Sequence, residues 1–221
     1  MLYIIPTPIG NLEDITLRAL NLLKEVDAVI AEDTRKSGFL LKHFSISKPL
    51  LSFHKFNEHQ VVSMFIKRMM AGETFALISD AGTPGISDPG FLLIREAIIN
   101  DIQVITLPGP TALIPAIVNS GLPCDRFAFE GFLPQKKGRQ KRLESLKHEN
   151  RTMIFYESPN RLLKTLENFA DIFGKERRAA VCREISKIYE ETHRGSLDEL
   201  TSFFGSHPVK GEIVIVIEGL K

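Results

Sequence analysis

Short β-branched apolar runs alternate with longer segments of mixed polarity along the first half of the chain. In the longer segments apolar residues recur three or four positions apart, which is the spacing of one helix face, and Thr16 is placed to cap the first of them. We predict strands at residues 2–5, 27–31, 75–79 and 102–107, and helices at residues 16–26, 58–70 and 91–99. Strands that alternate with helices predict βαβ units, a parallel sheet and therefore an α/β fold.

The sequence Leu-Pro-Gly-Pro at residues 107–110 interrupts this pattern, because it continues neither a strand nor a helix smoothly. After it, residues 111–120 predict a helix that ends at Gly121. The second half predicts strands at residues 126–133, 152–156, 179–183 and 212–218, and helices at residues 159–172 and 197–204. We therefore expect two α/β domains, residues 1–109 with a parallel sheet and residues 110–221 with a mixed sheet, and a ligand cleft between them.

Charge and composition limit the possible functions. The net charge is +1, so an RNA site would have to be a local basic patch. The two cysteines, Cys124 and Cys182, and the six histidines lack the spacing of metal ligands, so we expect no metal. The N-terminus has no basic stretch followed by a long apolar run, and no apolar stretch is long enough to cross a bilayer. We therefore expect a cytoplasmic protein without a membrane partner.

Four segments that follow predicted strands are candidates for chemistry, because loops at the carboxyl ends of parallel strands face a common crevice. They are residues 3–16 (YIIPTPIGNLEDIT), 32–36 (EDTRK), 77–90 (LISDAGTPGISDPG) and 107–112 (LPGPTA). None contains G-x-G-x-x-G or Gly-Lys-Ser/Thr, the sequences of the common phosphate-binding loops. Their glycines and prolines predict preformed loops whose backbone can approach a ligand closely.

Each of these segments also has a purely structural interpretation. The first could be no more than a stiff turn, and residues 32–36 could be a solvated charged loop. Asp80 or Asp88 could accept hydrogen bonds from ribose hydroxyls, but Asp88 is also placed to cap the helix that begins at Phe91. Thr111 could contact a ligand or cap the helix that follows it.

Six motifs occur in a fixed order along residues 1–219: PTPIGNLEDIT, AEDTR, ISDAGTPGISDPG, LPGPTA, YESPNR and KGEIVIV. Together they resemble the tetrapyrrole methylase superfamily, and more closely its ribosomal RNA branch. The resemblance implies two α/β domains, S-adenosylmethionine bound in the cleft between them, and a homodimer. It also implies methyl transfer to the ribose 2′-hydroxyl of a cytidine in small-subunit ribosomal RNA, presented as free RNA or as the 30S particle.

Matching motif positions implies donor contacts in the first domain and, more loosely, two in the second. These are Ile9, Asp80, Gly82, Thr83, Ile86, Thr111, Ala112, Tyr156 and Gly211. One motif departs from the wider superfamily. The corrin and porphyrin branches carry G-x-G-P-G-D after the first strand, whereas residues 6–11 of this chain read Pro-Thr-Pro-Ile-Gly-Asn, which argues against a tetrapyrrole substrate.

The acceptor side is expected at Glu32, Asp33 and Arg35. An acid there could take the hydroxyl proton, and Arg35 could hold a phosphate with its planar fork. The only strong basic block, residues 136–151, carries seven Lys or Arg against two Glu. It predicts a strip that contacts phosphates, an amphipathic helix with Leu143 and Leu146 packed inward, or both.

RNA contacts are expected at Lys36, Lys136, Lys137, Arg139, Arg161 and Arg183. For Arg161 and Arg183 the alternative is an Arg–Glu pairing that only stabilises the second domain. The aromatic residues, mostly Phe at strand and helix spacing, are expected in the core rather than as platforms for bases. Two other functions stay open: a tetrapyrrole carbon methylase, and a non-catalytic assembly factor that binds ribosomal RNA.

Overall fold

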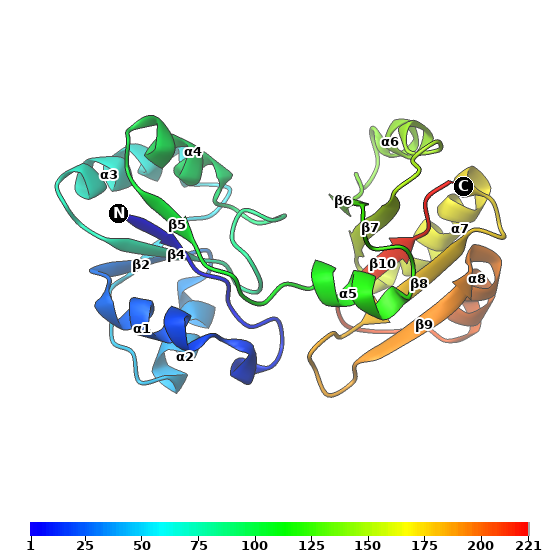
Figure 1. Cartoon of the computed structure of the whole chain (residues 1–221), viewed down its shortest axis with the longest axis horizontal. Helices are drawn as coiled ribbons and strands as arrows, with labels where there is room; N and C mark the ends of the chain where they lie inside the picture. Colours follow the sequence, from blue (N-terminus) through cyan, green and yellow to red (C-terminus); the bar gives the residue numbers. More distant parts are fainter. Residues whose placement is uncertain (221) are drawn as a thin grey trace. The chain divides into compact units, whose positions relative to one another are not determined.

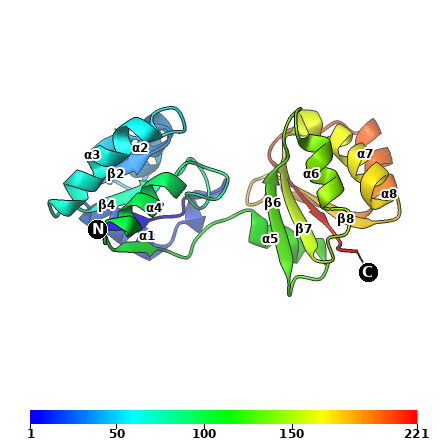
Figure 2. The same cartoon turned by 90° about the horizontal axis from the view of Figure 1, so that it is seen from above.

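A computed structural model describes residues 1–220 of the chain. The chain divides into two compact units, Met1–Thr111 and Ala112–Lys221, each built on its own five-stranded sheet (Figures 1 and 2). Each unit is an α/β structure, as the alternation of strands and helices predicts.

The sheet of unit 1 is entirely parallel, with strand order β3-β2-β4-β1-β5. Its strands are β1 (Leu2–Ile4), β2 (Ala28–Ala31), β3 (Leu50–Ser52), β4 (Phe75–Ile78) and β5 (Val104–Thr106). β2 and β4 are buried along their whole length, which explains why they are continuous apolar runs rather than alternating ones.

Helices cover both faces of this sheet. They are α1 (Leu17–Glu25), α2 (Thr34–His43), α3 (Glu58–Met70) and α4 (Phe91–Ile99). Apolar side chains of α3 and α4 pack on one face, and those of α1 and α2 pack on the other. The prediction that Thr16 caps α1 is confirmed, because its hydroxyl accepts a hydrogen bond from the backbone N–H of Ala19 at 3.1 Å.

Unit 2 has a mixed sheet with strand order β6-β7-β10-β8-β9. Its strands are β6 (Phe127–Phe132), β7 (Thr152–Glu157), β8 (Arg178–Arg183), β9 (Glu191–Ser196) and β10 (Ile213–Ile217). β6 runs parallel to β7, whereas β10 is antiparallel to both β7 and β8. The helices are α5 (Leu113–Ser120), α6 (Arg139–Ser145), α7 (Leu162–Phe173) and α8 (Leu197–Ser206).

The sequence pattern missed three elements, each for a physical reason. Helix α2 begins in the charged run at residues 32–36, so its first turn lacks an apolar face. Strand β3 is three residues long, which is too short to show alternation. Strand β9 has the polar sequence ETHRGS and lies at the edge of its sheet, so no alternation of apolar residues marks it.

Candidate functional site

The carboxyl ends of the five parallel strands of unit 1 bring the candidate segments to one edge of the sheet. Residues 5–11 follow β1, residues 79–90 follow β4, and residues 107–111 follow β5. Because β4, β1 and β5 are neighbours in the sheet, these three loops lie side by side. Residues 32–36 follow β2, and residues 53–57 follow β3, on the other half of the same edge.

Hydrogen bonds join the three loops into one structure. Thr7 and Gly82 exchange two backbone hydrogen bonds of 2.9 Å, and the Thr7 hydroxyl donates to the carbonyl of Ser79 at 2.9 Å. The Thr83 hydroxyl donates to the carbonyl of Pro110 at 3.3 Å. The donor contacts predicted at Gly82 and Thr83 therefore lie in one loop that is bonded to both of its neighbours. However, the backbone groups of Gly82 are already bonded to Thr7, so this residue holds the loops together.

Two of the glycines in the loop after β4 show why this loop needs that residue type. Gly82 has φ +79°, a left-handed conformation that side chains with a Cβ adopt only with strain. Gly90 has φ +149°, and a Cβ there would lie 3.1 Å from the backbone nitrogen of Gly85. Gly90 is also the residue that caps α4, without a side-chain hydrogen bond, so the alternative that Asp88 caps this helix is wrong.

The charged segment at residues 32–36 leads from β2 into helix α2. Asp33 is the N-cap of α2, and its carboxylate accepts a hydrogen bond from the backbone N–H of Arg35 at 2.9 Å. The Arg35 guanidinium bonds the same carboxylate through Nε at 3.1 Å and Nη2 at 2.7 Å. The side chain of Arg35 is nevertheless 89% exposed, so it is accessible to a ligand.

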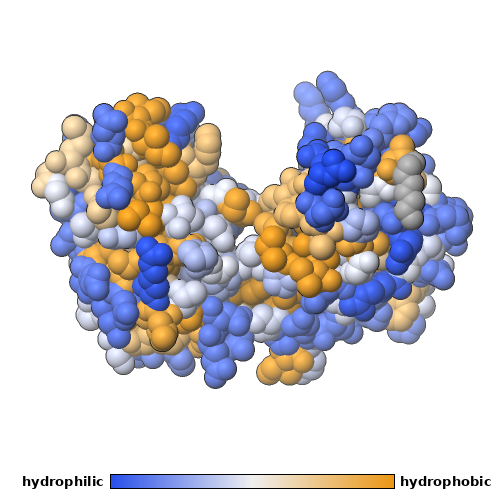
Figure 3. Space-filling model, viewed as in Figure 1, coloured by the Kyte–Doolittle hydropathy of each residue, from blue (hydrophilic) through white to orange (hydrophobic). Residues whose placement is uncertain are grey.

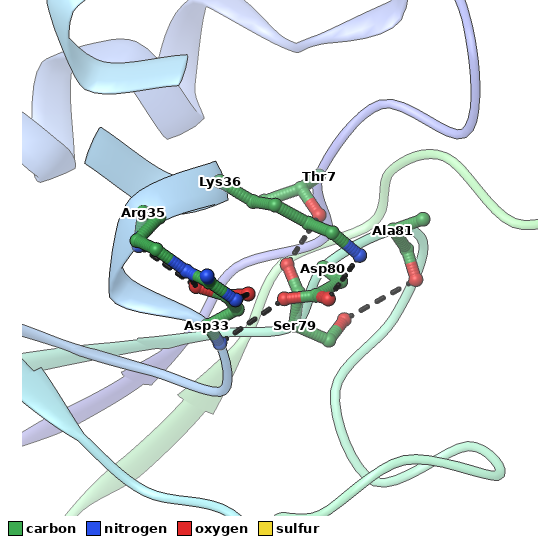
Figure 4. Close-up of polar contacts among 7 residues, drawn as sticks. All are labelled: Thr7, Asp33, Arg35, Lys36, Ser79, Asp80 and Ala81. Carbon is green, nitrogen blue, oxygen red and sulfur yellow. Dashed lines mark hydrogen bonds and ion pairs between the residues drawn. The ribbon is translucent and has the colours of Figure 1, made fainter. Parts of the chain in front are cut away.

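Asp80 connects the charged segment to the three loops (Figure 4). Its Oδ1 accepts a hydrogen bond from the backbone N–H of Asp33 at 3.1 Å, and its Oδ2 pairs with the Lys36 ammonium at 2.6 Å. A carboxylate has about four lone-pair positions, so Asp80 can accept further hydrogen bonds. The predicted donor contact Asp80 and the predicted RNA contact Lys36 thus form one ion pair.

The acids at this edge differ in their affinity for protons. Burial raises the pKa of Glu32, and the nearby Asp80 carboxylate raises it further. Burial, together with the negative charges of Glu32 and Asp80, raises the pKa of Asp88 to about 6. By contrast, hydrogen bonds from the side chain and backbone of Arg35 lower the pKa of Asp33. Of the two predicted acceptor-side acids, Glu32 is the stronger base.

A small pocket opens between the first turns of α2 and the loops after β1 and β4. Its volume is about 260 Å³, and its polar lining comes from Thr7, Lys36, Ser37, Ser79 and Asp80. The hydroxyl of Ser37 is buried and has no hydrogen-bond partner among residues 1–220. A buried hydroxyl without a partner is costly, which fits a recess that receives a polar group of a ligand.

The remaining predicted contacts of unit 1 lie on the same loops. Ile9 follows β1 and is half-buried, and Ile86, in the loop after β4, is 39% exposed. Thr111 is half-buried, and the N-cap of α5 is Ala112, which makes no side-chain hydrogen bond. The alternative that Thr111 caps this helix is therefore wrong.

In unit 2, the two predicted donor contacts lie at one end of neighbouring strands. Tyr156 is near the end of β7, where its ring contacts Phe129 and Phe132 at centroid distances of 5.0 and 5.6 Å. Gly211 precedes β10 and has φ +97°, and a Cβ there would overlap the Glu184 side chain. The packing around Gly211 thus also requires glycine for a structural reason.

Three of the predicted RNA contacts are held in pairs within unit 2. The carboxylate of Glu157, fully buried, pairs with Arg161 at 2.7 Å and lies 4.0 Å from Arg139, which also donates to Thr165 at 2.7 Å. Arg183 pairs with Glu191 at 2.5 Å. These contacts support the alternative that Arg161 and Arg183 stabilise the unit, and they extend it to Arg139.

Within the basic block at residues 136–151, the segment Arg139–Ser145 forms the short helix α6, in keeping with the interpretation of an amphipathic helix. Leu143 and Leu146 are buried in the core, as that interpretation predicts. Lys136 and Lys137, before the helix, are exposed, so they remain available to phosphates. Within residues 1–220, no group of His, Cys, Asp and Glu side chains is arranged to hold a metal ion, and no helix is long and apolar enough to span a bilayer.

Sequence reasoning missed Thr7, Ser37 and Ser79, which organise this edge. Thr7 lies inside the PTP motif, yet its bond to Ser79 joins positions 72 residues apart. The prolines and glycines of the loops after β1 and β4 were the signal in the sequence. They indicate preformed loops, but they do not reveal which residues join one loop to the other.

Comparisons with known proteins agree with this architecture. The model of the family described as tetrapyrrole (corrin/porphyrin) methylases matches residues 1–201. A Pseudomonas aeruginosa protein named ribosomal RNA small subunit methyltransferase I is 50% identical over 99% of this chain and 78% of its own length. A protein of the same name from Thermotoga maritima is 46% identical, over 99% of this chain and 98% of its own.

Among solved structures, uroporphyrin-III C-methyltransferase from Thermus thermophilus, complexed with S-adenosylhomocysteine, has the same fold. Its TM-score is 0.68 at 17% identity, and the match covers 98% of this chain and 96% of that one. The family match spans most of the chain, and the relatives are similar over nearly all of it. The chain therefore belongs to the tetrapyrrole methylase family.

Proposed function

We propose that this protein transfers a methyl group from S-adenosylmethionine to the ribose 2′-hydroxyl of a cytidine in small-subunit ribosomal RNA. The proposal is supported by two relatives named ribosomal RNA small subunit methyltransferase I, at 46% and 50% identity over 99% of this chain. The structural observation that carries it is that the edge formed by the carboxyl ends of the unit 1 strands has two halves of different chemistry. Interlocked loops rich in glycine and proline, with Asp80 and Asp88 as their charged residues, occupy one half, and the charged segment at residues 32–36 occupies the other.

The loops after β4, β1 and β5 fit the methyl donor. Ile9, Asp80, Thr83, Ile86 and Thr111 would hold it, with apolar contacts from the isoleucines and polar contacts from Asp80 and the threonines. The orphaned Ser37 hydroxyl and Asp80 line the recess beside these loops, which suits a ligand rich in hydroxyl and amino groups. When bound, the donor supplies a methyl group that its sulfonium already activates. Preformed loops would orient it without ordering cost.

Glu32 is proposed to accept the proton of the ribose hydroxyl. Its raised pKa makes its carboxylate a better base than an ordinary glutamate. Asp33 caps α2 and pairs with Arg35, so it is proposed to position that guanidinium. Arg35, being exposed, would hold a phosphate of the RNA with its free N–H groups.

Further phosphate contacts are proposed at Lys36, Lys136 and Lys137. Lys36 is paired with Asp80 but its side chain is 65% exposed. We also propose that the protein is a homodimer, as the family resemblance implies, and that it is cytoplasmic. Light scattering during size-exclusion chromatography tests the dimer, and a mass equal to one chain would contradict it.

The function is tested with RNA from a strain that lacks this protein. Purified enzyme and S-adenosylmethionine, without metal, should add one methyl group to a ribose of that small-subunit RNA, as mass spectrometry of nucleosides would show. RNA from the parent strain should accept none. Transfer to a porphyrinogen instead would establish a tetrapyrrole methylase. RNA binding that is independent of the donor, without turnover, would establish an assembly factor.

A further inference from the structure

A second surface pocket lies beside the acceptor half of the edge. Its volume is about 450 Å³, and it is formed by residues 87–92 and Arg95 on one side and by Lys55, Glu58 and His59 on the other. Asp88 belongs to its wall, and the charge of Glu32 acts on Asp88. The pocket therefore adjoins the proposed acceptor site within unit 1.

Two phenylalanine rings lie exposed in and beside this pocket. Phe91, in the pocket wall, is 66% exposed, and Phe56, next to Lys55, is 80% exposed. Exposing such large apolar rings is unfavourable in water unless another molecule covers them. This differs from the expectation that aromatic residues belong to the core, which holds for Phe53, Phe65 and Phe75.

A cation accompanies each exposed ring. The ammonium of Lys55 lies 4.9 Å from the centre of the Phe56 ring, and the guanidinium carbon of Arg95 lies 5.6 Å from that of Phe91. Lys55 forms no ion pair with any residue that the structure describes, so its charge is available. An aromatic face beside a cation matches a nucleotide, which offers a base to stack and a phosphate to neutralise.

The position of these residues follows from the strand order. Residues 53–57 leave the carboxyl end of β3, and β3 is the neighbour of β2, from which Glu32 and Arg35 emerge. Adjacent strands are about 4.8 Å apart. An RNA strand whose target ribose lies at Glu32 would therefore bring its next nucleotides over Phe56 and Phe91.

We propose that Lys55, Phe56, Phe91 and Arg95 form a platform that binds single-stranded RNA next to the target nucleotide. The inference rests on the proposed function, because it takes the substrate to be RNA. Bases stack on the two rings, and phosphates contact the two cations. Single-stranded RNA is the fitting class because a target ribose in a duplex would keep its neighbouring bases stacked on one another.

The experiment measures binding of small-subunit RNA from the deletion strain to the wild-type enzyme and its variants. Phe56→Ala and Phe91→Ala should each weaken binding by about tenfold, the scale of one lost base stack. Phe56→Trp, which keeps an aromatic ring, should bind RNA as the wild-type enzyme does. Phe56→Leu, which keeps apolar area but has no ring, should bind as weakly as Phe56→Ala. Lys55→Ala should lower the slope of log K against log salt by about 0.7. Donor affinity should be unchanged in all five variants.

Two variants on α3, outside the platform, serve as controls. Met70→Ala removes an exposed apolar side chain, and Lys67→Ala removes an exposed cation, both at the far end of the helix from the pocket. Neither should change RNA affinity. In Figure 3, apolar side chains also reach the surface over α3 and α4, so Met70→Ala tests whether general apolar exposure explains the effect.

The outcomes separate this proposal from the function on which it rests. If the wild-type enzyme methylates RNA but the Phe56 and Phe91 variants bind RNA normally, the platform is refuted. If Phe56→Ala instead changes the sedimentation of the protein alone, the surface joins protein chains, and the platform is again refuted. If the wild-type enzyme neither binds nor methylates RNA, the proposed function is refuted, and the platform that rests on it is refuted with it.

Discussion

Replacing Asp88 with asparagine should make the protein more stable at neutral pH and no more stable at pH 4. The carboxyl group of Asp88 is partly buried near Glu32 and Asp80, and these surroundings raise its pKa to about 6 from an ordinary 3.8. The native state therefore binds a proton more tightly than the unfolded chain. Stability is greatest below pH 3.8, falls as the pH rises toward 6, and is constant above it.

The size of the effect follows from the shift. A difference of about two pKa units corresponds to about 3 kcal/mol at most, since one unit is about 1.36 kcal/mol. The carboxyl group is not fully buried, so solvent screening reduces this to on the order of 1 kcal/mol. Asparagine imitates the protonated acid, so Asp88→Asn should gain that amount above pH 7 and nothing at pH 4.

Urea unfolding of both proteins at pH 4, 6 and 8 measures this difference. Asp171→Asn, at an exposed position of α7, controls for the loss of one negative charge. In a Glu32→Gln background the gain from Asp88→Asn should shrink, because Glu32 contributes to the raised pKa. A gain of equal size at pH 4 and pH 8, or a loss of stability at pH 8, would refute this account of the acidic cluster.

Arg35→Ala should slow methyl transfer about a hundredfold with donor affinity within about threefold by calorimetry; Arg35→Lys, lacking the planar fork, should restore little. Arg35 is exposed at the surface. Near-normal turnover of Arg35→Ala would remove this residue from the proposed acceptor site. Gly82→Val should weaken donor binding and lower the melting temperature, since φ +79° is strained for valine; unchanged values would contradict this. Neutralising Lys136 and Lys137 together should lower the slope of log K for RNA binding against log salt by about 1.4. An unchanged slope would show that these lysines face solvent without contacting phosphates.

Two helices with regular apolar patterns could be predicted from the sequence to the residue, and the other predicted helices to within one to three residues. Helices α3 and α4 begin and end where their apolar period predicts, because their buried faces are continuous. Strands buried on both sides were found as apolar runs, with ends one or two residues off. The elements that were missed are polar or very short, so tertiary contacts rather than local pattern determine them.

The site was predictable in position but not in its contacts. The rule that ligands bind at the carboxyl ends of parallel strands placed all four segments on one edge. It could not reveal that Asp80 pairs with Lys36, 44 positions away. Nor could positive charge show that Arg139 lies beside the buried Glu157, because a carboxylate partner distant in sequence leaves no local signal. The pair of Arg161 with Glu157 joins positions only four apart, and it agrees with the Arg–Glu alternative that the sequence offered.

The strand order explains why Asp80 cannot be assigned to one substrate alone. β4 lies between β2, which carries the charged segment, and β1, which carries one of the proposed donor loops. Asp80, just after β4, accepts the Asp33 N–H and pairs with Lys36 while it lines the recess beside the loops. Asparagine at this position would still accept the N–H bond but would release Lys36. A loss of activity on changing Asp80 would therefore combine effects on both halves of the edge, whereas Arg35 and Ile9, which lie on separate halves, each report on one half alone.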